Sequence, residues 1–95
     1  MSAPEHPAEL RARARSLRTL ATDLERSPVM SLDRDAGPDT WCVPRGAACL
    51  AALRTHQGHV HQAADDLRWL AHRLDLRADE LDAARARSAS QWTVG

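Results

Sequence analysis

The sequence predicts an all-α protein built as an antiparallel helical hairpin, and three observations support this prediction. Apolar residues recur at seven-residue steps over a long stretch, about 44–87. They recur in the same way over a shorter stretch, about 7–26. Between the two, residues 27–40 contain two prolines, a glycine and several serines and aspartates, which are typical of a connecting loop.

The first helix is expected over about 7–26, after a disordered N-terminus at residues 1–6. Pro7 suits the first position of a helix, because its missing N–H costs no hydrogen bond there. One leucine falls on the same face every two turns: Leu10, Leu17 and Leu24. The helix is expected to end near residue 26, because Ser27 precedes Pro28 and the helical conformation is disfavoured before proline.

The second helix is expected over about 44–87 and carries an apolar seam along its length. Successive heptads of the seam begin with Leu53, Val60, Leu67, Leu74 and Leu81. Further members lie three or four residues later in each heptad: Ala64, Leu70, Ala71 and Ala78. A helix of that length is roughly 60 Å long, which exceeds the core of a 95-residue globule. The seam must therefore be covered by a second helix, by another chain or by both, whereas residues 88–95 lack the period and are expected to form a disordered tail.

The charge and composition exclude several classes of partner. The chain has 13 arginines, no lysine and 13 acidic residues, so its net charge of 0 gives it no general attraction to nucleic acid or to an anionic membrane. Its three tryptophans are its only aromatic residues, too few to stack single-stranded bases. No apolar run approaches the roughly 20 residues of a membrane span, and the start MSAPEHPAEL is not a secretory signal peptide. We expect a protein that is made in the cytoplasm and has no membrane span.

Catalytic chemistry has little support in the sequence. Nucleophile-elbow, phosphate-loop and HExxH motifs are all absent. The acidic pairs at 65–66 and 79–80 are adjacent in sequence, so their members face apart on a helix. A two-helix scaffold also lacks a pocket that could exclude water from a substrate. We expect a protein that is not an enzyme, with no cofactor and no small-molecule substrate.

Three histidines lie close together in the long helix, at His56, His59 and His61. His56 and His59 are three residues apart and could share a metal ion, whereas His61 points elsewhere on a straight helix. The favoured interpretation is that these are polar residues at the surface or at the edge of the seam. The alternative function is a helical regulator that responds to metal or to pH through the cluster His56–His61.

The order of these features resembles that of the WXG100 (ESAT-6-like) superfamily. The resemblance covers roughly residues 8–86: a helix rich in leucine and alanine, a turn with Trp41, two alanines at 47–48 and a long helix. The turn at residues 39–44, DTWCVP, is similar to the Asp-Thr-Trp-x-Gly-Pro turn of actinobacterial members. The resemblance implies a small helical hairpin associated with type VII (ESX) secretion.

Two features depart from the family pattern. The glycine expected two residues after the tryptophan is Val43, which implies a different or relaxed turn. The family's export signal, a tyrosine followed four residues later by an acidic residue, is absent because the chain has no tyrosine. The resemblance implies either a protein exported by a type VII system or the partner or chaperone of one.

The resemblance also implies how such a chain works. It is expected to be a non-catalytic binding module that forms a four-helix bundle, as a homodimer or as a heterodimer with a related helical-hairpin chain. Trp41 would pack the turn against the partner's helix ends. Trp69 lies off the seam and is expected either to cover a neighbouring helix or to anchor a further partner. The predicted interface residues are Leu10, Leu17, Leu24, Trp41, Leu53, Val60, Leu67, Trp69, Leu70, Leu74 and Leu81.

Overall fold

The protein is helical throughout the part that its computed structural model describes, residues 5–93, with side chains described for residues 5–91. Two long helices and three single turns make up these residues: α1 (Pro7–Glu25), the 3₁₀ turn η1 (Pro28–Met30), α2 (Leu32–Asp35), the 3₁₀ turn η2 (Pro38–Trp41) and α3 (Pro44–Thr93). No strand occurs in residues 5–93. The predicted all-α class is confirmed.

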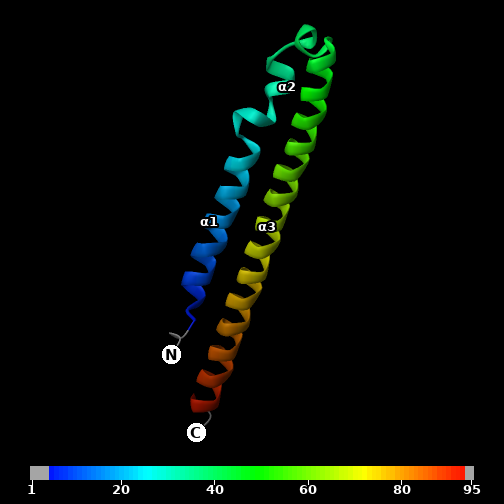
Figure 1. Cartoon of the computed structure of the whole chain (residues 1–95). Helices are drawn as coiled ribbons and strands as arrows, with labels where there is room; N and C mark the ends of the chain where they lie inside the picture. Colours follow the sequence, from blue (N-terminus) through cyan, green and yellow to red (C-terminus); the bar gives the residue numbers. More distant parts are fainter. Residues whose placement is uncertain (1–4, 94–95) are drawn as a thin grey trace.

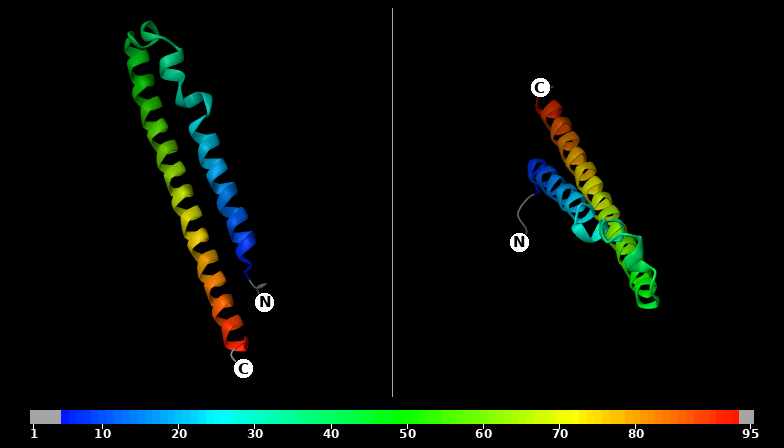
Figure 2. Two further views of the ribbon diagram at one scale, coloured as in Figure 1. Left: turned by 180° about the vertical axis from the view of Figure 1, so that it is seen from behind. Right: turned by 90° about the horizontal axis from the view of Figure 1, so that it is seen from above.

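The molecule is a rod whose length is that of α3. Its principal extents are 79 × 24 × 17 Å and its radius of gyration is 21.9 Å, whereas a globular chain of this size has a radius of gyration of about 13 Å. The 50 residues of α3 alone span about 75 Å at 1.5 Å per residue. α1 lies alongside α3 and runs in the opposite direction, as the views from both sides show (Figures 1 and 2).

The first helix forms where the sequence predicts it. Pro7 occupies the first turn of α1, and Glu9 lies in the same turn, where a negative charge complements the helix dipole. The helix ends at Glu25, one residue before the expected end. Its end comes just before Ser27, which is extended at φ −56° and ψ 141° ahead of Pro28.

The expected loop at 27–40 is instead a series of short helical turns fastened to α3. The indole Nε1 of Trp41 donates a hydrogen bond to the carbonyl oxygen of Asp33 at 3.0 Å. The side-chain amide of Gln57 in α3 donates to the carbonyl oxygen of Val29 at 2.9 Å and to a carboxylate oxygen of Asp33 at 3.0 Å. Single turns of this kind depend on such tertiary contacts, which a periodicity analysis does not detect.

Two glycines shape this connection. Gly37 has φ +83° and links α2 to η2 in a conformation that other residues rarely adopt. Gly46 is buried in the first turn of α3, where a Cβ atom would overlap the carbonyl oxygen of Thr40. Gly46 thus makes the close approach between α3 and η2, while Val43 is exposed.

The ends of the chain differ from the expected disorder. α3 continues to Thr93, beyond its expected end near residue 87. Residues 88–93 are therefore helical and do not form the expected disordered tail. No proline or glycine occurs between Gly58 and residue 94 to stop the helix. At the other end Glu5, within the expected disordered segment, pairs with Arg77 at 3.0 Å. Residues 1–4 and 94–95 and the side chain of Trp92 lie outside the described residues.

The core between the two helices is made almost entirely of alanine. The side chains of five alanines are completely buried: Ala14, Ala21, Ala64, Ala71 and Ala78. Leu10 retains 4% of its surface, and no side chain larger than alanine is completely buried in the described part. Because these alanines repeat every seven residues on each helix, they let the two backbones approach closely along one line.

Candidate functional site

The apolar seam of α3 is only partly used to contact α1. The row of alanines at 64, 71 and 78 faces α1, whereas the leucines that begin each heptad are half-buried beside the contact. Leu70, on the far side of that leucine row, keeps 44% of its surface exposed. α1 thus contacts the alanine side of the apolar stripe of α3, and the side with Leu70 remains exposed to solvent.

Ion pairs join α1 to α3 on the side of the contact opposite Leu70. Arg11 binds Asp79 at 2.9 Å and Asp82 at 2.6 Å, and Arg18 binds Asp75 at 2.6 Å. Glu25 accepts hydrogen bonds from Arg68 and from His61, the latter at 2.8 Å. Arg11, Arg18 and Glu25 repeat every seven residues, so they line one flank of α1, which we call the ion-pair flank.

The ion pairs change the protonation equilibria of their members. Hydrogen bonds to Asp82 and Asp79 raise the pKa of Arg11. Arg68, and to a smaller extent His61, hold the pKa of Glu25 below its ordinary value of 4.5. Both side chains remain partly open to solvent, so these pairs are not large sources of stability.

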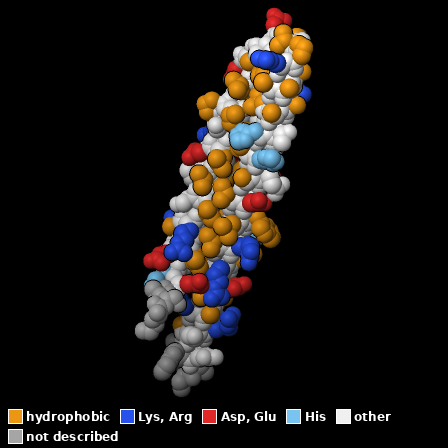
Figure 3. Space-filling model, viewed as in Figure 1, with side chains coloured by type: hydrophobic (Ala, Val, Ile, Leu, Met, Phe, Trp, Pro, Cys, Tyr) orange, Lys and Arg blue, Asp and Glu red, His pale blue; other side chains and the backbone are white. Residues whose placement is uncertain are grey.

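The open side of the contact forms an apolar groove. Leu17 of α1 with Leu70 and Leu74 of α3 lines a shallow depression of about 460 Å³, together with Ala12, Arg13 and Ser16. Figure 3 looks onto this side and shows hydrophobic side chains gathered along the line between the two helices. We call the surface formed by Leu17, Leu70 and Leu74 the leucine face.

The solvent-accessible surface of the chain is larger than that of a compact protein of the same mass. The solvent-accessible surface is 7232 Å² for a mass of 10.5 kDa, whereas a compact monomer of this mass exposes about 5,400 Å². The difference exceeds the roughly 800 Å² that one partner buries in a standard protein interface. The rod shape therefore leaves more surface exposed than a compact fold of the same mass does.

The predicted interface residues fall into three groups in the structure. Leu10 is buried within the chain, and Trp41 is half-buried in the connection. Trp69 is 62% exposed on the side of α3 away from α1, with its ring 5.7 Å from that of His72. The remainder lie half-buried or exposed along the seam: Leu17, Leu24, Leu53, Val60, Leu67, Leu70, Leu74 and Leu81.

The histidines do not come together. His56 and His59 are exposed on α3, and His61 binds Glu25 across the ion-pair flank. No group of three or more histidine, cysteine, aspartate or glutamate side chains that could hold a metal ion occurs among the described residues. The arrangement brings His61 to a carboxylate and an arginine, a contact that sequence spacing within α3 did not reveal.

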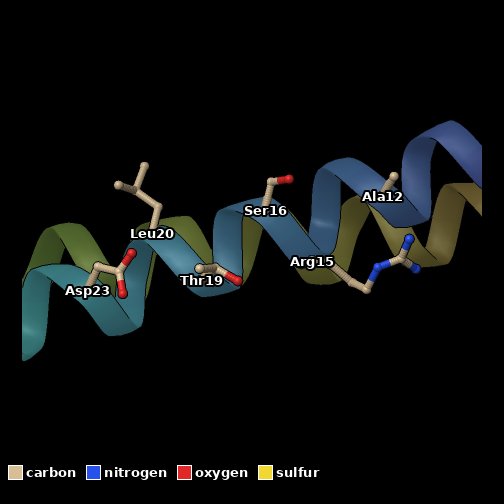
Figure 4. Close-up of a pocket in the computed structure, with 6 residues that line it drawn as sticks. All are labelled: Ala12, Arg15, Ser16, Thr19, Leu20 and Asp23. Atoms are coloured by element: carbon tan, nitrogen blue, oxygen red, sulfur yellow. The ribbon is translucent and has the colours of Figure 1, made fainter.

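A further depression of the surface lies on the outer side of α1. It measures about 600 Å³ and is lined by α1 residues alone. Figure 4 shows them in a row along the helix: Ala12, Arg15, Ser16, Thr19, Leu20 and Asp23. The depression is open to solvent, so it is a surface against which another chain could pack rather than an enclosed site.

Comparison with known proteins identifies no relative. No protein-family model, curated protein or solved structure matches the chain. Within the described residues, none of the helices combines the length and the apolar character needed to cross a bilayer.

Proposed function

We propose that the chain is a non-catalytic protein–protein interaction module, a helical hairpin that pairs through its leucine face with a second hairpin. The observation that supports this proposal is the open apolar groove at Leu17, Leu70 and Leu74, which adjoins a core made mainly of alanines. The partner is a second copy or a related helical chain, and the product is a four-helix bundle.

The proposal includes a role beside type VII secretion, as an exported protein or as the partner or chaperone of one. Its support is the resemblance of residues 8–86 to WXG100 proteins, with the tryptophan turn at residues 39–44. Type VII secretion genes next to the coding sequence would support this role. A neighbourhood without such genes would argue against it, while leaving the interaction module itself untouched.

The leucine face is tested with Leu70→Gln. The substitution keeps a good helix former but removes apolar contact at the centre of the groove, so we expect a pairing constant weaker by roughly tenfold or more. Light scattering at neutral pH, with thiols reduced, measures the mass over a range of concentrations.

Leu32→Gln is the matched control, because Leu32 is 45% exposed against 44% for Leu70 but lies in α2, away from the groove. Equal effects of the two substitutions would contradict the proposal. A wild-type chain that stays monomeric would assign the leucine face to a different, related chain, and that case is tested by the same pair of variants after co-expression.

A further inference from the structure

A second exposed surface lies on the side of α3 that faces away from α1. Trp69 is 62% exposed and Leu76, seven residues later, is 47% exposed. Arg73 lies between them, four residues after Trp69 and three before Leu76, so the three side chains share one stretch of the helix surface. We call Trp69, Arg73 and Leu76 the outer α3 patch. It lies on the opposite side of α3 from the alanines that contact α1, and Arg73 borders the leucine face because it follows Leu70 by three residues.

The charge available at this patch is positive. Three carboxylates around it form ion pairs within the chain, Asp65 with Arg68, Asp79 with Arg11 and Glu80 with Arg77, and a fourth, Asp66, accepts a hydrogen bond from Gln62. Arg73 forms no ion pair or side-chain hydrogen bond within the described part of the chain. The patch thus presents two apolar anchors with an uncommitted guanidinium between them, and the complementary surface has an apolar side chain next to a carboxylate.

The outer side of α1 carries that combination. Leu20 is 48% exposed and Asp23 lies one turn further along, without an ion pair among the described residues. Beside them Ala12, Arg15, Ser16 and Thr19 complete the lining of the depression of about 600 Å³ in Figure 4. We call this surface the outer α1 groove.

The two surfaces lie at the same height on opposite edges of the rod. The ion pairs Arg18–Asp75 and Glu25–Arg68 fix the register of the antiparallel helices. Because both helices rise 1.5 Å per residue, the same register places Leu20 level with Arg73. A sideways translation of one molecule, without rotation or sliding, would therefore bring the outer α1 groove onto the outer α3 patch of the next.

We propose that the outer α3 patch docks on the outer α1 groove of a second copy of this chain. Leu20 inserts between Trp69 and Leu76, Leu76 packs over the small residue Ser16, and Asp23 pairs with Arg73. The contact joins two different surfaces, so it is heterologous and extends into a row of molecules rather than closing into a dimer. The few side chains involved make it a weak contact, below the roughly 1,200 Å² of a stable interface.

The test is a charge exchange in a background whose leucine-face pairing is weakened. In Leu70→Gln we expect sedimentation equilibrium to show association that rises with concentration up to about 1 mM, in keeping with a weak contact. Arg73→Asp and Asp23→Arg each juxtapose like charges and are expected to weaken that association roughly tenfold. The double variant restores the ion pair with the two charges exchanged, and its association constant is expected to return to within about threefold of that of Leu70→Gln.

Arg87→Asp is the matched control, because Arg87 is an exposed arginine two heptads after Arg73 in the same row of α3. It makes the same change in net charge and is expected to leave association unaltered. Circular dichroism of each variant confirms that the helices are intact. The proposal is overturned if the Leu70→Gln chain remains monomeric at about 1 mM. It is also overturned if the double variant associates no more strongly than the single variants. The proposal does not rest on the leucine face, and these outcomes leave that surface to its own test.

Discussion

At the scale of single residues, the glycines of α3 show how one residue type has opposite effects at two positions. Gly46 is buried against Thr40, and the backbone itself occupies the place that a Cβ atom would take. Gly58 has no atom within 4 Å of that place, and α3 passes through it without interruption. The first glycine is required by packing, whereas the second only lowers the stability of the helix.

Gly58→Ala is expected to stabilise the protein by about 0.5–1 kcal/mol, because it removes the entropic disadvantage of glycine in a helix and meets nothing. Gly46→Ala is expected to destabilise it by about 1–3 kcal/mol, because η2 must move away from α3. Urea unfolding followed by circular dichroism measures both changes. Equal changes in the free energy of unfolding for Gly46→Ala and Gly58→Ala would show that η2 does not pack against Gly46.

Protonation of Glu25 at low pH is expected to weaken the contact between α1 and α3. Its pKa is held below 4.5 in the folded chain by Arg68 first and His61 second, so the folded state binds fewer protons than the unfolded state near that pH. The resulting stability is present above about pH 4.5 and is lost as the pH falls through the lowered value.

Glu25→Gln is therefore expected to lower the urea midpoint at pH 7 and to differ less from the wild type at pH 3. Asp23→Asn is the control, since it neutralises a carboxylate of the same helix that forms no ion pair in the described residues. A Glu25→Gln chain with the full pH dependence of the wild type would contradict this role.

At the scale of elements, helical periodicity was sufficient to locate α1 and the start of α3. It could not show which row of the seam faces α1, because the alanine and leucine rows are neighbours on one stripe. In the observed rotation, charges seven residues apart in α1 meet opposite charges in α3. Matching Arg11, Arg18 and Glu25 against 68, 75 and 82 in antiparallel order is the signal in the sequence that would have predicted it.

The connection and the end of α3 were less predictable for two different reasons. The turns between 28 and 41 form because Trp41 and Gln57 supply hydrogen bonds from a distance, and such contacts leave no periodic pattern. Residues 88–93 lack apolar spacing but also lack a helix breaker. Helix propensity without burial is enough to continue the last turns, and a search for amphipathic pattern misses it.

At the scale of the whole molecule, length dominates the dimensions of any assembly. The radius of gyration is 21.9 Å for a rod 79 Å long. A partner packed alongside at the roughly 8–10 Å spacing of helices adds little to that value, whereas an end-to-end partner would nearly double the length. We expect small-angle scattering of a pair formed through the leucine face to give a radius of gyration within about 2 Å of the single chain. A much larger value would show that the pair is joined at its tips.

The alanine core also constrains how the sequence can change over time. A core of large residues can exchange volume between neighbours, one side chain growing as another shrinks. Every replacement for an alanine except glycine adds atoms, and glycine is a poorer helix former; this applies at Ala14, Ala21, Ala64, Ala71 and Ala78. Substitutions at these five positions are therefore limited in both directions, while Leu17, Leu70 and Leu74 can vary together with whatever surface covers them. Divergence in a lineage of such chains would accumulate on the leucine face, changing the choice of partner while the pairing of α1 with α3 is preserved.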